Sequence, residues 1–173
     1  MEANSIETQQ GVQSAMIISK DALLENWQGH RRLTRRVIEA FPEDHFYNYS
    51  IGGMRTFAQL TMEMIAIAAP GIRGIAYRDW TFSEPTLDFT TPAPATKEAV
   101  LGLWDLVTEY IDTTWPQIEA ERFQEREAAF GMYEDTILGT TLYMIDNEIH
   151  HRGQGYVYLR ALGIEPPAFW DRH

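Results

Sequence analysis

The chain has 173 residues, of which 45% are hydrophobic, with 25 acidic against 14 basic side chains and a net charge of −11. A domain of this size buries roughly 70% of the surface that its unfolded chain exposes, so a single hydrophobic core is expected. The negative charge argues against nucleic acid and anionic membranes as partners, because both repel it. The chain has no cysteine, which excludes disulfides and thiolate metal ligands and fits a reducing cytoplasm.

Residues 1–18 form a polar N-terminal segment that lacks the basic start and the apolar run of a secretion signal. No stretch of about 18 uninterrupted apolar residues occurs in the chain, so no membrane span is expected. We therefore predict a soluble, cytoplasmic protein whose single folded domain covers residues 19–173.

Apolar residues recur at helical spacing in four long segments, and Ser19 can cap the first of them. In chain order they run from Ser19 to about Phe41, from Thr56 to a kink or end at Pro70-Gly71, from about Thr96 to a late kink at Pro116, and from Asp135 or Thr136 to Gly163. A further helical stretch can follow Pro70-Gly71 as far as about Trp80. Residues 42–55 and 81–95 are expected to be loops, and residues 122–134 irregular or briefly extended. The pattern predicts an all-α, up-down four-helix bundle in one domain.

The last predicted helix has one uncharged arc when residues 139–162 are placed on a helical wheel. Asn147 and His151 lie on this arc as an i,i+4 pair, close enough to act on one ligand. The charged residues of the helix fall on the remaining arc, which holds Asp146, Glu148, Arg152 and Arg160. We expect the uncharged arc to face the bundle interior, where the pair forms either a ligand site or a buried histidine satisfied by an amide.

Glu63 is the only charged residue between Arg55 and Arg73 in the second predicted helix. A carboxylate in such an apolar segment either reaches solvent at a gap in the bundle or finds a cation or hydrogen-bond donor inside it. Glu63 is therefore a second candidate for a polar site.

Four arginines cluster on the first predicted helix, at positions 31, 32, 35 and 36. They could grip phosphate, but in so acidic a chain a solvated helix face paired with local carboxylates is the better interpretation. The neighbouring His30 has no companion ligand at helical spacing, so we expect an ordinary polar residue there.

The last predicted helix contains NEIHHRGQ at residues 147–154, which continues as GYVYLRALGIEPP, and MRTF stands at residues 54–57, at the start of the second. These two motifs resemble those of the DinB family. The resemblance implies a four-helix bundle, often a homodimer, in which one histidine of the second helix and two of the fourth bind a divalent metal. The family includes metal-dependent transferases and isomerases that use low-molecular-weight thiols. Its name reflects the DNA-damage induction of a founding gene and does not imply DNA binding.

Transferred residue by residue, the family's metal ligands fall on Glu63, Asn147 and His151, so only one of the three histidines is kept. Two oxygens and one imidazole nitrogen make a harder ligand set than three imidazoles, which weakens zinc or nickel binding and makes manganese conceivable. Equally, Glu63 could hydrogen-bond His151 directly and leave a metal-free polar pair.

Two functions therefore stay open. The resemblance implies a metal-dependent thiol transferase or isomerase, which would need a small-molecule thiol as cosubstrate because the chain has no cysteine. The alternative is a non-catalytic, stress-associated bundle whose metal site has become a hydrogen-bonded polar core. Apolar residues also line the outer arc of the last helix, which favours a homodimer in either case.

Overall fold

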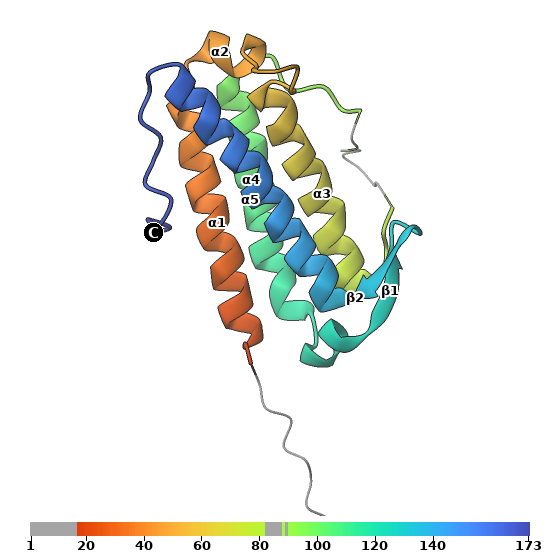
Figure 1. Ribbon diagram of the computed structural model, residues 1–173. Coiled ribbons are helices and arrows are strands. Elements are labelled where there is room, and N and C mark those ends of the chain that lie inside the picture. Colours follow the sequence, from red (N-terminus) through yellow and green to blue (C-terminus); the bar gives the residue numbers. More distant parts are fainter. Residues whose placement is uncertain (1–16, 82–87, 89) are drawn as a thin grey trace, which may run out of the picture.

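The computed structural model describes residues 17–81, 88 and 90–173 (Figure 1). Four long helices pack into one bundle: α1 (Lys20–Ala40), α3 (Phe57–Tyr77), α4 (Lys97–Thr114) and α5 (Ile137–Ala161). The predicted all-α bundle is confirmed. Most of the polar N-terminal segment and part of the loop predicted over residues 81–95 lie outside the described residues. Within the described part of the chain, no helix is long and apolar enough to cross a membrane.

Side-chain caps fix the starts of the four long helices. The hydroxyls of Ser19, Thr56, Thr96 and Thr136 each accept a hydrogen bond from the backbone N–H three residues further on. At Thr56 the cap is reciprocal, because the side chain of Gln59 also accepts from the backbone N–H of Thr56. The predicted starts are confirmed, whereas α3 continues through Pro70 to Tyr77.

The four long helices do not follow a simple up-and-down order. The start of α4 lies at the end of α1, where the Lys97 ammonium donates to the carbonyl of Phe41, and the start of α1 lies at the end of α4, where the Lys20 ammonium donates to the carbonyl of Ile118. The Tyr158 hydroxyl near the end of α5 donates to the carbonyl of Arg55, just before α3. The order is therefore up, down, down, up, with α3 and α4 parallel (Figure 1).

Two short elements fill the connections. Helix α2 (Glu43–Asn48) lies in the segment that was predicted as a loop. Pro42 stands at its N-cap position without a side-chain hydrogen bond, and the acidic first turn favours a helix start there. Strands β1 (Arg126–Ala129) and β2 (Tyr133–Thr136) form an antiparallel hairpin that pairs Ala129 with Tyr133. This hairpin follows two single-turn 3₁₀ helices, η1 (Trp115–Gln117) and η2 (Ala120–Gln124), and leads directly into α5.

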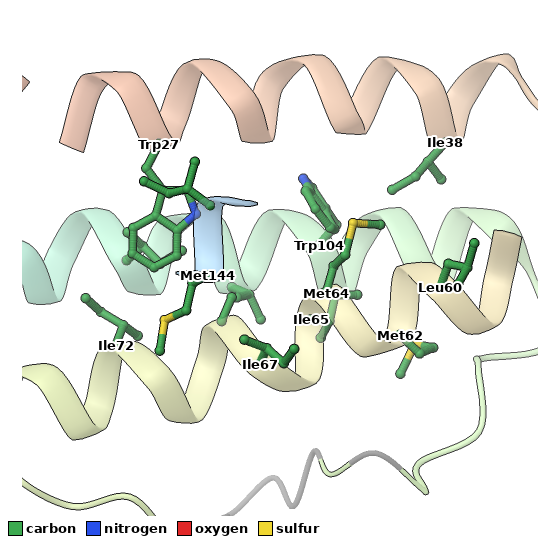
Figure 2. Packing of buried hydrophobic residues seen from close by; sticks show 14 of the residues in the cluster. Trp27, Ile38, Leu60, Met62, Met64, Ile65, Ile67, Ile72, Trp104 and Met144 are labelled. Carbon is green, nitrogen blue, oxygen red and sulfur yellow. The ribbon is translucent and has the colours of Figure 1, made fainter. Parts of the chain in front are cut away.

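Aliphatic side chains make up most of the buried core, and aromatic rings and methionines pack among them (Figure 2). Trp27 of α1 and Met144 of α5 point toward α3, whereas the Trp104 ring of α4 lies on the side that faces α1. Helices α3 and α5 approach closely where each carries a glycine: a methyl group on Gly71 would lie 2.2 Å from Met144 Cε, and one on Gly155 would lie 2.4 Å from Phe57 Cε2. This close packing sets the distance between the two helices that carry the predicted site residues.

Candidate functional site

The three predicted site residues lie together between α3 and α5. His151 Nε2 lies 2.9 Å from Glu63 Oε1. Since a carboxylate only accepts, the imidazole N–H is the donor. The Asn147 amide also donates to Glu63 Oε1, over a longer distance of 3.4 Å. The structure thus joins Glu63 to both residues of the predicted pair on α5.

Two further residues complete the site and were not assigned from the sequence. Arg55 forms an ion pair with Glu63 Oε2, and Gln154 Oε1 lies 3.2 Å from His151 Nδ1. Both residues were visible in the sequence, Arg55 inside the MRTF motif and Gln154 one turn beyond the histidine, but neither pattern indicates a partner. We call Arg55, Glu63, Asn147, His151 and Gln154 the open cluster.

The neighbours of Glu63 stabilise its ionised form. Burial pushes the pKa of Glu63 upward, but the hydrogen bonds and charges of His151 and Arg55 outweigh it, so the pKa of Glu63 lies below its ordinary value. The Glu63 side chain is 19% exposed and that of Arg55 50% exposed. Solvent therefore reaches the pair and weakens its contribution to stability.

Two cavities meet at Glu63. One, of about 640 Å³, lies between α3, α5 and the hairpin, and is lined by Glu63, Ile67, Tyr143 and Met144 among others. The other, of about 340 Å³, lies between α3 and the segment before α4, and is lined by Arg55, Gln59 and Glu63 among others. A partly buried carboxylate therefore borders two spaces large enough for small molecules.

The donor set does not fit the metal centre that the resemblance implies. Among the described residues no group of three or more His, Cys, Asp or Glu side chains could hold a metal ion. Arg55 also places a positive charge on the carboxylate that a cation would need. One observation points the other way: Asn147 Oδ1 is buried and has no hydrogen-bond partner in the described part of the chain.

A second polar cluster on α5 contradicts part of the helical-wheel prediction. Glu148 and Arg152 fall outside the uncharged arc and were expected to face away from the interior, but both are buried against α1. The Thr34 hydroxyl donates to Glu148 Oε1 over 2.6 Å, and Arg31 Nη1 lies 3.7 Å from Glu148 Oε2. The prediction failed because it treated charge as a sign of exposure, although a buried charge is tolerated where a partner on another helix compensates it.

The prediction for the four arginines of α1 holds for three of them and fails for Arg31, which contacts this second cluster. Arg32, Arg35 and Arg36 pair with carboxylates near the surface, as predicted. Arg31 is instead fully buried, with its guanidinium over the Trp104 ring at 3.8 Å and its Nε donating to the Thr108 hydroxyl over 2.7 Å.

His30 also belongs to this interior. Arg152 Nη2 lies 3.0 Å from His30 Nδ1, and Arg172 Nη1 of the C-terminal segment lies 3.1 Å from His30 Nε2. We call His30, Arg31, Thr34, Glu148 and Arg152 the closed cluster.

These observations define the class of protein. It is a helical bundle with a polar cluster between its second and fourth long helices. The DinB family model matches residues 16–172, so the chain belongs to the DinB family. Among curated proteins, none matches the chain.

Two solved structures have a similar fold. A DinB-like protein from Bacillus cereus has a TM-score of 0.71 at 14% identity, with 87% of this chain and 97% of that chain covered. The DinB-like protein YjoA from Bacillus subtilis has a TM-score of 0.66 at 16% identity, with 87% and 99% covered. At these identities the similarity supports the fold alone.

Proposed function

We propose that this chain is a metal-independent member of the DinB family that binds a small molecule in the 640 Å³ cavity beside Glu63. The carrying observation is that both oxygens of Glu63 are engaged, Oε1 by His151 at 2.9 Å and Oε2 by the Arg55 guanidinium. A carboxylate held in this way acts as a fixed polar group at the edge of a cavity whose lining mixes apolar, aromatic and polar side chains, as ligand sites commonly do.

Metal independence is tested by restoring the family ligands. Protein purified without an affinity tag is stripped with a chelator, reconstituted separately with zinc, nickel and manganese, and analysed for bound metal. We expect less than about a tenth of an equivalent in the wild type, and close to one equivalent in the Glu63→His/Asn147→His variant, which regains three imidazoles. His151→Ala in the restored background is the control and should abolish binding.

Metal near one equivalent in the wild type, lost in His151→Ala, would overturn this proposal. It would instead support a second candidate, a metal-dependent thiol transferase or isomerase with a low-molecular-weight thiol as cosubstrate. The observation that favours this candidate is the buried, unpartnered Asn147 Oδ1, because rotation of that amide would turn an oxygen toward Glu63 and His151.

Ligand binding is tested with a fragment collection of mixed charge, monitored by ligand-observed NMR. Tyr143 lines the cavity and is 62% exposed, whereas Tyr77 is 49% exposed and does not line it. At least one class of fragment should lose its signal in Tyr143→Ala and keep it in the matched control Tyr77→Ala. If every fragment that binds is indifferent to Tyr143→Ala, the cavity is not a ligand site.

A further inference from the structure

The cavity beside Glu63 has an unusual combination of lining side chains. Three carboxylates contribute to it, from Glu63, Glu134 and Asp135, together with three aromatic rings, from Phe130, Tyr133 and Tyr143. The remaining lining residues are apolar or carry a hydroxyl, and no lysine, arginine or histidine is among them. The lining is therefore both acidic and aromatic.

The negative charge of this lining is only partly compensated. Arg55 and His151 engage Glu63. Within the described residues, Glu134 forms one ion pair, with Arg126 at 3.9 Å, and both side chains are more than half exposed. An exposed pair of this kind is strongly screened by water. Asp135 accepts a hydrogen bond from the backbone N–H of Thr136. A neutral or anionic ligand would have to desolvate the hairpin carboxylates without compensation, which is unfavourable, whereas a cation would compensate them.

Two of the rings that line the cavity are largely open to solvent. Tyr133 of β2 and Tyr143 of α5 are 64% and 62% exposed, so their rings are not used by the core. Phe130, in the turn of the hairpin, adopts a left-handed backbone conformation with φ of 55° and packs edge-on against Trp80 with ring centroids 5.5 Å apart. Gly131 has a positive φ as well, so the left-handed conformation belongs to the tight turn of the hairpin, which sets the Phe130 ring beside the cavity.

From this lining we infer that the cavity binds a small organic cation, an amine with an apolar body. The ammonium group would lie against the rings of Tyr133 and Tyr143 and near the hairpin carboxylates, since cations are attracted to aromatic faces and to negative charge. The apolar body would pack on Ile67 and Met144. The inference rests on the proposed function, because it names the ligand class of the same cavity.

Three probes with one body separate charge from apolar contact: 3-phenylpropylammonium, 3-phenylpropanol and 3-phenylpropionate. Binding to the full chain is measured by isothermal titration calorimetry at low and moderate salt. We expect the amine to bind about tenfold more tightly than the alcohol, the propionate to bind more weakly than either, and the advantage of the amine to shrink as salt is raised.

Variants locate the site. Glu134→Gln/Asp135→Asn should reduce the preference for the amine over the alcohol, while Glu119→Gln/Glu121→Gln, which removes the same charge from exposed residues outside the cavity, should leave it unchanged. Tyr143→Leu should weaken amine binding, and Tyr77→Leu should not. The first control has the same net charge as its test variant, and the second loses one tyrosine ring, as its test variant does.

Equal affinity for amine and alcohol, or an amine preference that survives Glu134→Gln/Asp135→Asn, overturns the inference. So does the absence of amine binding. The proposed function fails separately, since it requires only that some fragment class depends on Tyr143. If the cavity binds neutral or anionic fragments in a Tyr143-dependent way but no amine, the proposed function holds and the inference of an organic cation is overturned.

Discussion

Helix α5 carries two polar clusters on adjoining faces, and their surroundings differ. The open cluster faces α3, includes the half-exposed Arg55 and borders two cavities through Glu63. The closed cluster faces α1, where the side chains of Arg31 and Glu148 are 0% and 3% exposed, and it lines neither of those cavities. The same helix thus uses one polar face to hold the bundle together and the next to border a ligand-sized space.

The carboxylates of the two clusters respond oppositely to their environments. Burial raises the pKa of Glu148 and outweighs the opposing charges of Arg31 and Arg152. At Glu63 the balance is reversed, and the pKa is lowered. A fully buried carboxylate needs its partners to offset the cost of desolvation, so removing one partner lowers stability strongly. A carboxylate that keeps contact with solvent can lose a partner at small cost. The comparison predicts that the closed cluster carries stability and the open cluster does not.

The largest effect is expected from Arg31→Met. The change leaves the buried Glu148 without its α1 cation, so the free energy of unfolding should fall by about 3 to 5 kcal/mol. Urea denaturation followed by circular dichroism measures it. Arg35→Met on the same helix is the control, because Arg35 pairs with Asp105 near the surface and its loss should cost less than about 1 kcal/mol. Equal losses in the two variants would contradict a structural role for the closed cluster.

A smaller effect is expected from acid, through His30. Burial, then the charges of Arg152 and Arg172, lowers the pKa of His30 from 6.5 to about 4. The folded protein therefore binds fewer protons than the unfolded chain between these values, and stability is lost as pH falls through that window. Allowing for solvent near His30, the loss should be about 2 kcal/mol between pH 7 and pH 4.5.

His30→Gln isolates this contribution, because glutamine cannot titrate but still offers an acceptor to either arginine. Denaturation of both proteins at the two pH values cancels the contribution of every other titrating group. Parallel pH dependence in wild type and variant would place the acid sensitivity elsewhere.

The bundle could be predicted from the sequence because its signals are local. Ser19, Thr96 and Thr136 cap helices through backbone groups only three residues away, so their pattern is readable without knowledge of the fold. The short helix α2 was missed because its six residues are too few to show a helical period, and the proline before it indicates the end of a helix. The parallel arrangement of α3 and α4 shows in contacts between distant segments, such as that of Lys97 with Phe41, which no local pattern specifies.

The candidate site was predictable only in part. Glu63, Asn147 and His151 were found because they share an apolar segment or a helix face, and the structure brings them together. Their partner Arg55 lies outside the helix that carries Glu63, and its contact is a property of the folded chain. The same limit explains the error at Glu148, whose compensating Arg31 and Thr34 are more than a hundred residues away.

The smallest effect on stability is expected from Glu63→Gln, the variant that tests most directly whether the open and closed clusters differ. Glutamine keeps the size of the side chain and can still accept from His151, so the main loss is the ion pair with a half-exposed arginine. Such pairs contribute little, and the free energy of unfolding should fall by less than about 1 kcal/mol in the same denaturation experiment.

Ligand binding should respond differently from stability in this variant. Glu63 lines the 640 Å³ cavity, so fragments whose binding depends on Tyr143 should bind Glu63→Gln several-fold more weakly even though the fold is intact. Arg31→Met should show the reverse, a large loss of stability with fragment affinity preserved at temperatures where it stays folded. If Glu63→Gln instead costs as much stability as Arg31→Met, both faces of α5 are structural, and the solvent contact of Glu63 has no functional meaning.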